Sequence, residues 1–87
     1  MNSQTIQNQI YQWASNRHDF TAPYGVLSGS HVSPNGKRYL SVTFGKARTL
    51  DATVEIYNRN FIILKTSNHG RQVFKNVNEL QQALDAL

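Results

Sequence analysis

Hydrophobic residues near the N-terminus recur with the period of a helix. A 3.6-residue repeat places them on one stripe, which consists of Ile6, Ile10, Trp13 and Ala14. The pattern predicts an amphipathic helix over residues 4–16, with Ser3 as its N-cap. The face opposite the stripe is expected to meet solvent and carries Gln7, Gln9 and Gln12.

The middle of the chain alternates between apolar and polar residues, which is typical of antiparallel strands that are covered on one face. The alternation is clearest over residues 38–44 and 50–57, and shorter patterns predict strands at 61–64 and 71–75. Residues 24–32 contain two glycines, so they predict a weaker first strand that is bulged or lies at an edge. Polar turns separate the strands. Ser33-Pro34-Asn35-Gly36 is predicted as the turn after the first strand, because Pro presets φ and Asn-Gly tolerates positive φ, and Asn58-Arg59-Asn60 is predicted as a short hairpin turn.

A second helix is expected at the C-terminus. Asn76 is placed to cap it, and Glu79 three residues later completes a variant of the capping box. The apolar face of this helix is expected to consist of Val77, Leu80, Leu84 and Leu87.

This order predicts one α+β domain spanning residues 1–87, since a chain of this length makes a single domain. It has an N-terminal helix, a four- to five-stranded antiparallel meander sheet and a C-terminal helix. Both helices are expected on one face of the sheet, in a two-layer sandwich whose other face is exposed. The covered face is expected to comprise Leu40, Val42, Phe44, Leu50, Val54 and Ile56.

The composition argues against disulfide-bonded, membrane-spanning and secreted proteins. There is no cysteine, which excludes disulfides and thiolate chemistry. No apolar run reaches the roughly 18 residues that a membrane span needs, and residues 1–12 lack the pattern of a secretory signal. A cytoplasmic protein without a membrane partner is the simplest prediction.

The positive charge is concentrated in the predicted sheet. Residues 37–75 hold eight of the nine Lys and Arg residues but only two carboxylates, Asp51 and Glu55. Such a surface favours an acidic partner, either nucleic acid or an acidic protein surface.

Catalytic and metal-binding patterns are weak. Asp51 and Glu55 are four positions apart on one strand, roughly 13 Å, which is too far for an acid–base pair. His18, His31 and His69 have no metal-ligand spacing, and no glycine-rich phosphate loop is present. The sequence therefore predicts a protein that is not an enzyme and uses no cofactor or metal.

The stronger signal is the combination of aromatic rings with cations on the polar sheet face. Tyr39, Tyr57, Phe61 and Lys65 are predicted to share that face. The cations expected at its rims are Arg38, Lys46, Arg48, Arg59 and Arg71. Aromatic rings on a sheet can stack bases while cations bind phosphates. The tyrosines are equally suited to ordinary cross-strand pairing, and the two carboxylates on the same face would repel phosphate.

Two functions remain open. The favoured hypothesis is a small non-enzymatic module that binds nucleic acid through its basic sheet face and loops. The alternative is a protein-binding or inhibitor module, of the kind used by phages or plasmids, that occludes a partner with its sheet face or edge strand. The apolar run Phe61–Leu64 exceeds what one covered face can bury, so a homodimer is expected unless Phe61 and Ile63 are both buried.

Overall fold

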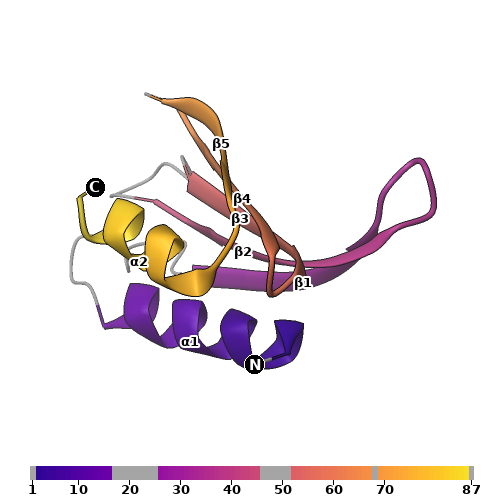
Figure 1. Ribbon diagram of the computed structural model, residues 1–87. Coiled ribbons are helices and arrows are strands. Elements are labelled where there is room, and N and C mark those ends of the chain that lie inside the picture. Colours follow the sequence, from indigo (N-terminus) through magenta and orange to yellow (C-terminus); the bar gives the residue numbers. More distant parts are fainter. Residues whose placement is uncertain (1, 17–25, 46–51, 68, 87) are drawn as a thin grey trace.

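The computed structural model describes residues 2–16, 26–45, 52–67 and 69–86 of the 87-residue chain. Its elements follow the predicted order of one helix, five strands and a second helix (Figure 1). They are α1 (Ser3–Ser15), β1 (Val26–Val32), β2 (Arg38–Phe44), β3 (Ala52–Asn58), β4 (Phe61–Thr66), β5 (Gly70–Phe74) and α2 (Val77–Asp85). Leu50 and Leu87, which were expected in the core, lie outside the described residues.

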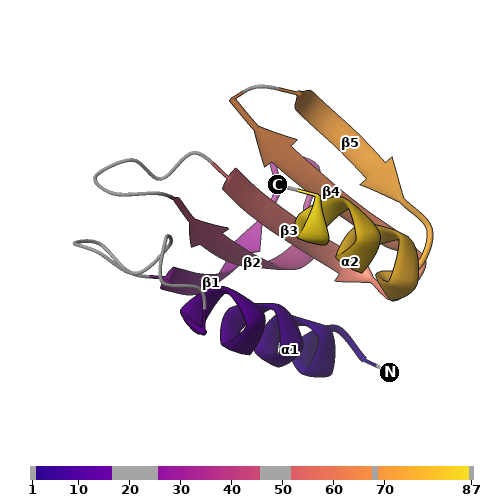
Figure 2. The same cartoon turned by 90° about the vertical axis from the view of Figure 1, so that its left-hand side faces the viewer.

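The five strands form one antiparallel sheet in which each strand pairs with the next one along the chain. Both helices lie on the same face of this sheet, α1 beneath β1–β3 and α2 beneath β4 and β5 (Figures 1 and 2). The predicted two-layer sandwich is therefore confirmed. We call the side with the helices the covered face and the other side the open face.

The core lies between the covered face and the two helices. Its fully buried side chains come from every element except β1 and β5. Trp13 of α1 packs edge-to-face on Phe44, with 5.6 Å between ring centroids. The predicted stripe of Ile6, Ile10 and Ala14 is buried together with Leu80 and Leu84 of α2.

Two details of α1 differ from the sequence prediction. The N-cap is Asn2 rather than Ser3, because the Asn2 side chain accepts from the backbone N–H of Thr5 at 2.8 Å. Gln7 does not face solvent and is only 7% exposed. Its Nε2 donates to the backbone oxygens of Gly29 and Ser41, at 3.0 and 3.1 Å, and thereby fastens α1 to β1 and β2.

The predicted cap of α2 is confirmed. The Asn76 side chain accepts from the N–H of Glu79 at 2.8 Å. The reciprocal bond of the capping box is displaced by one residue, because the Glu79 carboxylate accepts from the N–H of Lys75 at 3.4 Å rather than from that of Asn76.

The hairpin that joins β1 to β2 gives the open face its shape. Its tip, residues 33–37, extends beyond the other strands and bends away from the helices (Figure 1). The N–H of Gly36 donates to the oxygen of Ser33 at 2.9 Å, and Gly36 has a φ of 86°, a left-handed conformation that glycine adopts without strain. The turn predicted at Ser33-Pro34-Asn35-Gly36 is thus confirmed.

The apolar run of β4 is divided between the two faces. Ile62 and Leu64 belong to the core. Ile63 lies on the open face but is nevertheless buried, with only 2% of its surface exposed. Phe61 is 37% exposed. Within the described part of the chain, neither helix is long and apolar enough to cross a membrane.

Candidate functional site

Four aromatic side chains cross the open face from β1 to β4. His31, Tyr39, Tyr57 and Phe61 come from four consecutive strands, and each ring lies against the next. The ring centroids are 5.2 Å apart for His31–Tyr39, 4.9 Å for Tyr39–Tyr57 and 5.3 Å for Tyr57–Phe61. We call this series the ring ladder. Cross-strand pairing of aromatic residues stabilises a sheet, so the ladder first of all explains why β1–β4 hold together on this side.

The ladder also limits which rings remain accessible. The planes of neighbouring rings are inclined by only 28–33°, so the rings lie face to face rather than edge to face. Tyr39 and Tyr57 each have a ring neighbour on both sides. Only the two ends, His31 and Phe61, have one ring neighbour within the ladder. A planar ligand would therefore extend the stack at an end rather than lie across the two tyrosines.

At the β1 end, the imidazole of His31 lies over a glycine. Its Nε2 is 2.9 Å from the hydroxyl of Ser41. A Cβ on Gly29 would come within 2.8 Å of the same nitrogen, so only glycine leaves room for the ring in this position. A serine next to a histidine is the pairing that activates nucleophiles, but Ser41 is only 6% exposed. We interpret the pair as a structural link between β1 and β2.

The charges of the open face are partly paired. Lys65 forms an ion pair with Glu55, with 3.0 Å between Nζ and Oε2. The side chain of Glu55 is largely buried, whereas about half of that of Lys65 is exposed. Glu55 therefore adds little free negative charge to this face, although the sequence had suggested that it would repel phosphate. Asp51 lies outside the described residues.

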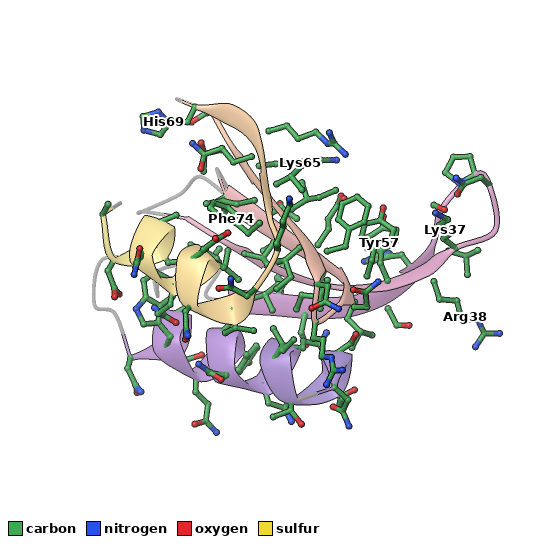
Figure 3. All side chains as sticks on the ribbon, viewed as in Figure 1. Lys37, Arg38, Tyr57, Lys65, His69 and Phe74 are labelled. Atoms are coloured by element: carbon green, nitrogen blue, oxygen red, sulfur yellow. The ribbon has the colours of Figure 1, made fainter. Side chains whose placement is uncertain are left out.

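A cleft of about 730 Å³ lies between the bent hairpin tip and the open face of β3, β4 and β5. The hairpin contributes Ser33, Pro34, Asn35, Lys37 and Arg38, and the sheet contributes Tyr57, Asn58, Phe61, Ile63 and Arg71. Of these described lining residues, three are cations and none is a carboxylate. The accessible end of the ring ladder, Phe61, thus lies in the lining of a positively charged hollow. Figure 3 labels Tyr57 and Lys37, which line the same hollow from the sheet and from the hairpin.

The residues predicted to form a binding surface are only partly brought together. Tyr57, Phe61 and Arg71 line the cleft, Tyr39 belongs to the ring ladder, and Lys65 lies on the same face in its ion pair. Arg38 also lines the cleft, but its guanidinium end points away from Tyr57 (Figure 3).

Arg59 and the loop cations stand apart from this group. Arg59 is in the β3–β4 turn, where it borders a small separate hollow with Asn2, Ser3 and Asn58 near the start of α1. Lys46 and Arg48 lie outside the described residues.

Sequence reasoning missed the polar residues of the cleft, namely Ser33, Asn35, Lys37 and Asn58. The sequence predicts turns at Ser33, Asn35 and Asn58 and counts Lys37 only among the cations of residues 37–75. The place of all four in the cleft depends on the bend of the hairpin, which no local pattern encodes. One local signal indicates the hairpin side of the cleft, namely the run Pro-Asn-Gly followed by Lys37 and Arg38. This run places two cations directly after a tight turn.

Among the described residues there is no group of three or more acidic or histidine side chains that would hold a metal ion. Comparison with protein-family models, with curated proteins and with solved structures finds no match to this chain. The site is therefore interpreted from its own geometry.

Proposed function

We propose that the protein binds single-stranded nucleic acid, with an unpaired base and its phosphate held in the cleft between the hairpin tip and the open face. The observation that carries this proposal is the lining of the cleft, which joins an accessible aromatic ring to the cations Lys37 and Arg71, with no carboxylate among the described lining residues. The proposal includes the expected cytoplasmic location, where such a ligand is available.

Each part of a nucleotide has a matching group. Phe61 ends the ring ladder, so a base placed against it would continue the stack. Arg71 and Lys37, which line the cleft, would bind the phosphate through their positive charge. The side-chain amides of Asn35 and Asn58 offer both donors and acceptors to base edges.

The size of the cleft favours a single strand. Ligand pockets of about 300–1,000 Å³ enclose small molecules, and the cleft falls within this range. A duplex is far wider and keeps its bases stacked inside, whereas an unpaired strand can extend individual bases into such a hollow.

Fluorescence anisotropy with labelled single- and double-stranded DNA and RNA, measured over a salt series, tests the proposal. Phe61→Ala should weaken single-strand binding by about 5- to 150-fold, equivalent to 1–3 kcal/mol for one stacked base, without changing the salt dependence. Arg71→Ala should weaken binding and lower the slope of log K against log salt by about 0.7.

Arg59→Ala is the matched control for Arg71→Ala, because it removes the same charge from a residue near Phe61 that does not line the cleft. It should leave the salt slope nearly unchanged. Equal effects of the two arginine variants would contradict a defined phosphate site. No binding of any oligonucleotide at low salt would overturn the proposal and leave the protein-binding alternative in its place.

A further inference from the structure

The outer edge of β1 lacks the features that normally keep sheet edges apart. A free edge presents unpaired backbone N–H and C=O groups, and proteins protect it with charged residues, proline, bulges or short strands. β1 contains no Lys, Arg, Asp, Glu or Pro, and it pairs with β2 over seven residues without a register shift. Among the described strands, β2 is its only neighbour in the sheet. The other edge strand, β5, has five residues and carries Arg71.

The register shows which backbone groups of β1 are free. The N–H of Ser33 donates to the oxygen of Lys37 at 2.8 Å, which makes these two residues a hydrogen-bonded pair at the end of the hairpin. Such pairs alternate along an antiparallel ladder, so the odd-numbered residues of β1 bond to β2. The even-numbered residues turn their N–H and C=O groups to the free edge, and these are Val26, Ser28, Ser30 and Val32.

The sequence of this edge is nearly symmetric about its middle. It reads Val-Leu-Ser-Gly-Ser-His-Val, with Gly29 at the centre. If a second copy runs antiparallel about Gly29, Ser28 lies opposite Ser30 and Val26 lies opposite Val32. These are the residues whose backbone groups are free, so about eight hydrogen bonds can form without disturbing either sheet. A two-fold interface needs a patch that complements itself in this way.

We propose that β1 is a self-association edge, at which a second copy of this chain continues the sheet through an antiparallel β1–β1 pair centred on Gly29. The pairing gives new neighbours to two exposed apolar side chains. Val32, 63% exposed, packs against Val26 of the second copy, and Leu27, 51% exposed, packs against its His31.

The two-fold axis of this dimer runs perpendicular to the sheet, because antiparallel pairing of identical edges keeps the same faces on the same side. The ten strands then form one sheet with all helices on one side and both clefts on the other. The proposal does not depend on what the clefts bind.

Amide hydrogen exchange of the full chain, followed residue by residue by NMR, gives the sharpest test. Odd-numbered residues of β1 are bonded within each chain and should exchange slowly at any concentration. The amides of Ser28 and Ser30 should exchange fast when the chain is dilute and slowly when it is concentrated. An edge pair of this length is expected to bury less surface than the roughly 1,200 Å² typical of stable complexes, so the association should depend on concentration. Light scattering should therefore show a dimer at high protein concentration.

Ser28→Pro removes an edge N–H that β2 does not use, and it should abolish the dimer while circular dichroism shows an unchanged fold. Ser28→Thr keeps the N–H and should still dimerise. A monomer at every concentration would overturn the proposal. So would a dimer that survives Ser28→Pro, or slow exchange that develops at β5 instead of at Ser28 and Ser30. If Ser28→Pro proves misfolded, the concentration dependence of exchange in the unchanged chain decides alone.

Discussion

Gln7 shows how much depends on one polar side chain between a helix and a sheet. Its Nε2 donates to Gly29 and Ser41, and its Oε1 accepts from Gln4 at 3.0 Å. The side chain is thus both buried and fully hydrogen-bonded, which is the condition under which a polar group can lie in a core without a large cost. It also fixes the position of α1 along β1 and β2.

We expect Gln7→Ala to lower the free energy of unfolding by about 1–3 kcal/mol, because it removes two buried hydrogen bonds and leaves a cavity. Gln7→Glu should cost more, since a carboxylate would face two carbonyl oxygens. Urea denaturation followed by Trp13 fluorescence measures both. Gln12→Ala, an exposed position on the same helix, is the control and should change stability by less than about 0.5 kcal/mol. A Gln7→Ala variant as stable as this control would contradict the structural role.

The burial of Gln7 marks a limit of sequence patterns. The 3.6-residue repeat correctly located Ile6, Ile10 and Ala14, because these lie at the centre of the buried stripe. Gln7 lies on the flank of that stripe, where burial depends on how far the sheet extends sideways. Ser28 and Ser30 on β1 are small, so the covered face leaves space there for an amide. No local pattern contains that information.

At the scale of elements, the strands and their faces were predictable because period-two alternation is a local property. It located β2 without error and correctly assigned the core side chains of β3. The bend of the β1–β2 hairpin and the register shift between Ile56 and Asn58 were not predictable, since both arise from twist and packing between strands. For this reason Tyr39, Tyr57 and Phe61 were predictable as rings of the open face, whereas the place of His31 beside Tyr39 and the cleft that contains Phe61 were not.

Helix α2 is short, so its stability depends on its cap and on two leucines. We expect Leu84→Ala to cost about 2–5 kcal/mol, because Leu84 is fully buried against the sheet. The exposed Gln82 on the same helix provides the control Gln82→Ala, which should be nearly neutral. Thermal denaturation measures both variants. An unchanged melting temperature for Leu84→Ala would mean that α2 is not part of the cooperative unit.

The cap of α2 can be tested separately. Asn76→Ala removes the acceptor for the N–H of Glu79 and should lower the free energy of unfolding by about 1 kcal/mol. Asn78→Ala removes the same side chain two residues later, where it makes no capping bond, and should have a smaller effect. Equal losses for the two variants would show that the bond to Glu79 contributes little.

At the scale of the whole molecule, the proposed binding site and the proposed dimer edge are different parts of one sheet. The cleft lies over β3–β5 and the hairpin tip, whereas the proposed dimer edge is the outer side of β1. The predicted fold was sufficient to foresee a free sheet face and a free edge. Which groups these surfaces present depended on the register of β1 with β2 and on the bend of the hairpin.

The strand order, in which every strand pairs with its neighbour along the chain, has a consequence for the speed of folding. Closing a short turn costs little entropy, so hairpins such as β3–β4, whose turn is Arg59-Asn60, can form early. Docking of α1 spans a longer stretch of chain and is expected to follow the transition state. Ile62→Val in β4 should therefore slow folding, whereas Ile10→Val in α1, at an equally buried site, should mainly accelerate unfolding. Stopped-flow fluorescence of Trp13, the single tryptophan, measures the folding rate and the unfolding rate separately. Equal slowing of folding by both variants would mean that α1 docks before the folding transition state.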